Sequence, residues 1–170
     1  MSENVSHQFD RLPATEAERE VEERPTREEI VAFWDDRFGV DPDVFAGHTF
    51  WERGNGKIWA FASELETPMD IEALGMSFTR TRQEHWKPTT EAVQRFGRHA
   101  ERNVMHLTRG EAETFITGED QQLDWSGDWG YLIVTHDIAG EPEPIGVGLY
   151  VHGELRSQIP KGRRRELGGE

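Results

Sequence analysis

The sequence predicts an α+β protein in which a small N-terminal α/β lobe precedes a barrel-like β domain with short helices. Three observations lead to this prediction. Two helices begin at capping boxes, short β-rich runs lie between turn residues, and the chain has no internal repeat and no GxGxxG turn. We therefore expect a disordered or weakly ordered acidic tail over residues 1–24, the lobe over residues 26–79 and the barrel-like domain over residues 80–170.

The N-terminal lobe is predicted from one helix and three β-rich runs. The segment Thr26-Arg27-Glu28-Glu29 has the form of a capping box, and Gly39 supplies a left-handed stop. A short turn over residues 41–45 follows. The β-rich runs are residues 48–53, 57–63 and 75–81. The first two flank Gly54-Asn55-Gly56, which predicts a hairpin, and a connecting segment around Thr67-Pro68 precedes the third.

The second domain is predicted from two helices and four β-rich runs. Pro88-Thr89-Thr90 indicates a helix start, with the end near Gly97. A capping box at residues 108–111 opens the other helix, which stops at Gly118. The runs are residues 103–107, 130–135, 145–151 and 154–159. The last two meet at His152-Gly153, which is typical of a hairpin turn. Antiparallel pairing of the last three strands then predicts a compact barrel-like domain.

The composition is strongly acidic, with 33 acidic residues against 19 Lys and Arg and a formal charge of −14. Only three basic residues are lysine, at positions 57, 87 and 161. Many carboxylates with few lysines favour a halophilic protein that stays soluble in a molar-salt cytoplasm; the alternative is an acidic interaction surface. No apolar stretch approaches the length of a membrane span, so we expect a cytoplasmic protein without membrane contact.

Basic residues are concentrated in two islands. Residues 75–110 carry a net charge of +4 and residues 155–170 a net charge of +3, on either side of a segment with a net charge of −10. Solvation alone would have made these islands acidic too, so an anionic partner is the simplest reason for them. The alternative is that they only form ion pairs with neighbouring acids. If both islands serve one site, Lys87 or Arg82 should share a face with Lys161.

Motifs for catalysis are weak. The chain has no Cys, which excludes thiolate chemistry, and its seven His residues have no HxxxH or HExxH spacing. We expect no cofactor, no metal site and no catalytic residue. Asp124, Asp128 and Asp137 form a loose acidic cluster, but close carboxylates are expected by chance in so acidic a chain. Trp125 and Trp129 are interpreted as core residues that close the barrel rather than as platforms for base stacking.

The C-terminal strands carry the most specific pattern. Residues 145–150 read Ile-Gly-Val-Gly-Leu-Tyr, and residues 157–165 read Ser-Gln-Ile-Pro-Lys-Gly-Arg-Arg-Arg. This ending resembles the RNA-binding PUA-like domain of the Fmu/Sun (RsmF-type) RNA cytosine 5-methyltransferases. The resemblance extends upstream to residues 87–90, 102–104 and 108–117, and to Arg37-Phe38-Gly39-Val40 as in free-standing archaeal relatives grouped under ribosome biogenesis. It implies a PUA-like mixed β-barrel as the RNA-binding domain over residues 80–170, after a pre-PUA-like lobe.

The resemblance implies the RNA-holding part of those enzymes without their catalytic part, because this chain has neither a Cys nor room for an S-adenosylmethionine fold. The implied partners are structured RNA (rRNA or tRNA) and an RNA methyltransferase or ribosome-assembly factor, with no DNA. The expected RNA-binding residues are Arg80, Arg82, Lys87, Arg102, Arg156, Gln158, Lys161, Arg163, Arg164 and Arg165. Gly146 and Gly148 are expected to let another backbone or a ribose-phosphate approach their strand.

Two other functions stay open. The protein is alternatively an adaptor that binds another protein through its acidic lobe, with the basic islands only structural. It is otherwise a small hydrolase or nuclease on a PUA-like barrel that uses the region of Asp124 and Asp128. Copurifying RNA would separate the RNA-binding reading from both.

Overall fold

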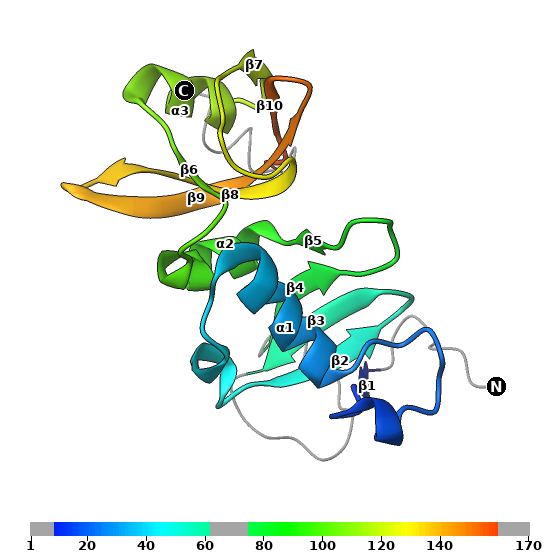
Figure 1. Cartoon of the computed structure of the whole chain (residues 1–170). Helices are drawn as coiled ribbons and strands as arrows, with labels where there is room; N and C mark the ends of the chain where they lie inside the picture. Colours follow the sequence, from blue (N-terminus) through cyan, green and yellow to red (C-terminus); the bar gives the residue numbers. More distant parts are fainter. Residues whose placement is uncertain (1–8, 62–74, 160–170) are drawn as a thin grey trace.

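The computed structural model describes residues 9–61 and 75–159, which form two five-stranded sheets (Figure 1). The first sheet has the order β1-β2-β3-β4-β5, and all of its neighbouring strands are antiparallel. Its strands are β1 (Phe9–Arg11), β2 (Thr49–Arg53), β3 (Lys57–Phe61), β4 (Met76–Arg80) and β5 (Lys87–Pro88). The hairpin predicted at residues 54–56 joins β2 to β3.

The second sheet has the order β6-β8-β9-β10-β7. Its strands are β6 (Val104–His106), β7 (Gln121–Gln122), β8 (Gly130–Ile138), β9 (Glu141–Val151) and β10 (Glu154–Ser157). Only β6 and β8 are parallel; the other neighbours are antiparallel. The predicted α+β class is confirmed. Within the described ranges, however, β6 and β7 remain the edges of an open sheet, so closure into a barrel is not observed.

In the part of the chain that the structure describes, three α-helices connect the strands: α1 (Arg27–Phe38), α2 (Thr90–Phe96) and α3 (Arg109–Ile116). Both predicted capping boxes are confirmed, because Thr26 and Thr108 accept from the third helical amides and Glu29 and Glu111 bond back. Short 3₁₀ turns lie at Glu16–Glu18, Pro42–Phe45 and Gly97–His99. Gly39 ends α1 in the left-handed conformation, with φ of 67°.

The largest hydrophobic core joins the two sheets. Trp34 of α1 stacks on Phe78 of β4 with ring centroids 4.9 Å apart, and both are fully buried. The same cluster includes Phe96 of α2 and reaches Ile133 of β8 and Val147 of β9. Figure 1 shows α2 lying between the sheets. A second cluster, which includes Leu107, Phe115 and Leu155, packs beneath α3.

Besides the open sheet, two boundaries differ from the sequence expectation. The first is that residues 9–24 pack on the first sheet, although they fall in the predicted weakly ordered tail. β1 pairs with β2, Phe9 and Leu12 are buried, and Arg24 forms ion pairs with Asp10 and Glu52. The second is that β5 pairs with β4 and belongs to the first sheet. The first sheet therefore extends to Pro88 and does not end at residue 79.

Candidate functional site

A row of cations crosses the edge of the first sheet. In the strand register Lys57 of β3 lies opposite Arg80 of β4, and Arg80 lies opposite Lys87 of β5. Residues directly opposite one another on antiparallel strands present their side chains on the same face. Among the described residues, none of the three has a carboxylate partner. We call Lys57, Arg80 and Lys87 the cationic row.

Lys87 links this row to the second sheet. Its Nζ donates to Gln158 Oε1 at 3.0 Å and lies 5.7 Å from the centroid of the Tyr131 ring. Burial, and to a lesser degree the neighbouring charge of Arg80, lowers the pKa of Lys87. Gln158 belongs to the second basic island, so the two islands approach each other here. Lys161, which was expected to share a face with Lys87 or Arg82, lies outside the described residues.

Other predicted site residues have different surroundings. Arg82 lies 3.1 Å from the carboxylate of Glu23, and Arg156 lies 2.9 Å from that of Glu154. Arg102 donates to the carbonyl oxygens of Asp35 and Asp36 at the end of α1, which is a helix-capping contact. Arg163, Arg164 and Arg165 lie outside the described residues. The structure therefore brings Arg80, Lys87 and Gln158 together, while strand register adds Lys57, which the sequence analysis missed.

An aromatic pocket of about 260 Å³ lies beside the cationic row. Its lining comes from α1, the segment after β4 and the start of β8: Phe33, Arg37, Glu84, His85, Trp86, Trp129, Gly130 and Tyr131. Tyr131 belongs both to this lining and to the contact with Lys87. Trp129 is 58% exposed, so its interpretation as a core residue is wrong. Trp125 is partly buried against the second core, as expected.

Arg37 and Gly130 shape the pocket wall. Arg37 donates to the carbonyl oxygen of Trp129 at 3.0 Å and to that of Tyr131 at 2.8 and 3.1 Å. Gly130 has a φ of 112°, and a Cβ there would meet the Arg37 guanidinium at 3.2 Å. A side chain at this position would be strained and would displace the guanidinium. Arg37 is thus a structural residue that fixes the start of β8 against α1.

Gly146 and Gly148 do not provide a surface for a ribose-phosphate. A Cβ on Gly146 would meet the Ile159 side chain at 2.6 Å, and one on Gly148 would meet the Leu155 side chain at 2.5 Å. Both glycines are buried. The space above them is filled by apolar side chains of the second core, so the expectation that a ribose-phosphate approaches there is wrong.

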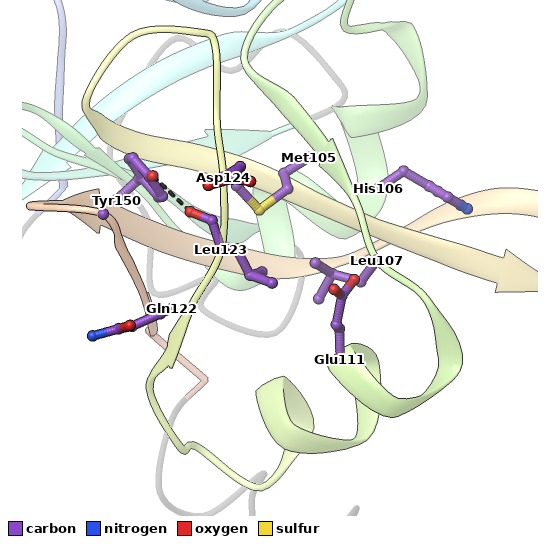
Figure 2. Close-up of a pocket in the computed structure, with 9 residues that line it drawn as sticks. Met105, His106, Leu107, Glu111, Gln122, Leu123, Asp124 and Tyr150 are labelled. Carbon is purple, nitrogen blue, oxygen red and sulfur yellow. Dashed lines mark hydrogen bonds between the residues drawn. The ribbon is translucent and has the colours of Figure 1, made fainter.

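A second pocket, of about 630 Å³, contains the acidic residue of the hydrolase alternative, Asp124. It also contains His106 and Glu111, but Figure 2 shows His106 pointing away from both carboxylates. Glu111 accepts from the Thr108 amide in the capping box, and His106 contacts Thr135 and Asp137. Asp128 is bonded to Asn103 instead. Within the described parts of the chain, no group of three His, Asp or Glu side chains is arranged to hold a metal ion.

Two family matches divide the chain. Residues 1–75 match a family of unknown function (DUF7122), and residues 102–165 match the methyltransferase RsmF PUA domain. The second match contains β6 to β10 and confirms that the C-terminal part is a PUA-like domain resembling that of RsmF. No curated protein matches the chain. Arg80 and Lys87 lie between the two matched segments. None of the described helices has the length and apolar character needed to cross a bilayer.

Proposed function

We propose that this protein is a non-catalytic RNA-binding protein that holds structured RNA, either rRNA or tRNA, in RNA modification or ribosome biogenesis. The match to the RsmF PUA domain supports an RNA partner in an RNA-modification setting. An RNA methyltransferase or a ribosome-assembly factor is the protein partner that this setting suggests.

The observation that carries the proposal is the cationic row. In a chain with a formal charge of −14, Lys57, Arg80 and Lys87 stand opposite one another without a carboxylate partner among the described residues. Like charges directly opposite one another on neighbouring strands are destabilising. An RNA phosphate would remove this repulsion and form charge-assisted hydrogen bonds with the row. Such a row is therefore better suited to a polyanion than to structural ion pairing.

The C-terminal basic island would extend this surface. Gln158 contacts Lys87 at 3.0 Å, so the last described part of the chain lies beside the cationic row. Arginine can hold a phosphate with two parallel hydrogen bonds and can stack on a base. Lys161, Arg163, Arg164 and Arg165 are accordingly proposed to bind the RNA that the row positions.

The proposal is tested by fluorescence anisotropy with a labelled rRNA or tRNA stem-loop. The double variant Arg80→Ala/Lys87→Ala is expected to bind at least about tenfold more weakly, because each lost charge-assisted contact contributes on the order of 1 kcal/mol or more. The triple variant Lys161→Ala/Arg163→Ala/Arg164→Ala is expected to lose a similar amount. Both variants should unfold at the same denaturant concentration as the wild type.

The matched control is Arg98→Ala/Arg109→Ala. It removes two exposed arginines of the same basic island that do have acidic partners, Glu143 and Glu113. This control should retain near wild-type affinity. The titration is repeated at about 0.2 and 2 M KCl to separate stacking and shape from screened charge. Equal dissociation constants for the wild type and both site variants, or no RNA binding by the wild type, would overturn the proposal and favour the adaptor alternative.

A further inference from the structure

We propose that the aromatic pocket receives one unpaired RNA base and that Glu84 makes guanine the preferred base. This inference rests on the proposed RNA-binding function and deepens it, because it names the part of the RNA that is read. It depends on three observations: two tryptophans held by ring contacts, a pocket tyrosine that also contacts Lys87, and a carboxylate that has no ion pair among the described residues.

The tryptophans of the pocket are held in place by contacts with other aromatic rings. The Trp86 ring packs against Phe33 with centroids 5.5 Å apart, and Trp129 meets the His152 ring edge to face at 5.3 Å. The start of β8, where Trp129 lies, is fixed by the hydrogen bonds from Arg37. Trp129 nevertheless leaves 58% of its surface exposed. Rigid, exposed aromatic side chains are the groups on which unpaired bases stack.

The position of the pocket fits a base rather than a free aromatic ligand. Tyr131 lines the pocket, and the centroid of its ring lies 5.7 Å from Lys87 Nζ. A base in the pocket and a phosphate at the cationic row would thus both lie next to Tyr131. A phosphate at Lys87 and Arg80 would therefore be followed directly by a base at Trp129. A base inside a duplex cannot enter, because its faces are covered by its neighbours.

Glu84 provides the base preference. It lines the pocket, it is exposed, and no ion pair or hydrogen bond of its carboxylate occurs among the described residues. The guanidinium of Arg37 is already used by the carbonyl oxygens of Trp129 and Tyr131. An ionised carboxylate only accepts hydrogen bonds. Guanine presents two adjacent donors, N1–H and N2–H, whereas adenine, cytosine and uracil place an acceptor beside their donor.

The test uses RNA stem-loops that are identical except for a single bulged nucleotide, which is G, A, C, U or absent. Dissociation constants are measured by fluorescence anisotropy on the full chain. The wild type should bind the bulged G about tenfold more tightly than the RNA without a bulge, because stacking of one base contributes roughly that much. Trp129→Ala should remove this difference, and Trp129→Phe should keep most of it.

Glu84→Gln should remove the preference for G over A while leaving the difference between bulged and unbulged RNA. Two controls are matched to these variants: Ile138→Ala removes an exposed apolar side chain on the far end of β8, and Glu141→Gln neutralises an exposed glutamate at the start of β9. If the wild type binds all the RNAs equally and Trp129→Ala changes nothing, the pocket inference is overturned while the RNA-binding function stands. If the wild type binds no RNA, both are overturned.

Discussion

Two groups of basic residues in this protein contrast in their surroundings. Arg82, Arg98, Arg109 and Arg156 each lie 2.9 to 3.6 Å from a carboxylate and are exposed, so they resemble ordinary surface ion pairs. The cationic row has no such partner among the described residues, although the chain carries 33 acidic residues. The difference teaches that the number of charges in a segment does not locate a binding surface. We propose instead that such a surface lies where the fold leaves several neighbouring cations without an acid among the described residues.

The largest expected effect concerns an ion pair that is buried. Arg24 Nε lies 2.8 Å from Glu52 Oε1, and the two side chains are only 12% and 4% exposed. Arg24→Ala is expected to lower the free energy of unfolding by about 3 kcal/mol, because it leaves the buried Glu52 carboxylate without this cation. Denaturant titration measures the change.

RNA affinity of the folded Arg24→Ala variant should equal that of the wild type. If the free energy of unfolding falls by less than about 0.5 kcal/mol, Arg24 behaves like the exposed arginines. The contrast between buried and exposed ion pairs would then be wrong. The double variant Arg24→Ala/Glu52→Gln should recover part of the loss, since it removes the buried charge as well as its partner.

A smaller effect is expected from His48, which becomes a cation only on acidification. Its ring packs against Phe96 at 5.3 Å, and neither ring nitrogen has a hydrogen-bond partner among the described residues. Burial, followed by the charges of Arg95 and Arg27, lowers the pKa of His48 below 6.5. Above pH 6.5 the ring is neutral in both the folded and the unfolded chain, so it adds no pH dependence there.

As the pH falls below 6.5 the unfolded chain binds this proton first, so stability should decrease until the folded-state pKa is passed. His48→Gln should show a shallower loss of stability between pH 6.5 and 5, measured by thermal unfolding across that range. Identical pH profiles for the wild type and His48→Gln would show that a protonated His48 does not lower the stability of the folded protein.

The smallest effect is expected at Arg156, which the sequence analysis assigned to RNA binding. Its Nε is 2.9 Å from Glu154, and both side chains are partly exposed. Arg156→Ala should change the free energy of unfolding by less than about 0.5 kcal/mol and the RNA dissociation constant by about twofold at most. A tenfold loss of affinity by anisotropy would show that the ion pair opens on binding and that Arg156 belongs with the cationic row.

Local signals in the sequence predicted much of the fold. The capping boxes at Thr26 and Thr108 gave correct helix starts, and Gly54-Asn55-Gly56 gave the hairpin, because each depends on residues close in sequence. β1 was missed because it has a single buried apolar residue, Phe9, within three residues. β5 was missed because Pro88 argues against a strand and only its edge position makes pairing possible.

The candidate site was less predictable, because it depends on long-range register. Lys57 joins Arg80 only through the pairing of β3 with β4, and no pattern within either strand contains this information. The backbone at Trp129 likewise accepts a hydrogen bond from Arg37, over 90 residues away, which no local pattern contains. By contrast, the acidic pattern that frames the basic islands was visible from residue counts alone.

The core shared by the two sheets has a consequence for modularity. The match to the RsmF PUA domain begins at residue 102, yet Ile133 and Val147 from that segment lie in one cluster with Phe96 and Trp34 from outside it. An excised segment 102–165 would expose that apolar face to water, so the unit recognised by family likeness and the unit that folds cooperatively have different boundaries. The PUA-like segment and its N-terminal neighbour are therefore expected to unfold in one cooperative step, because apolar side chains of both fill the same core.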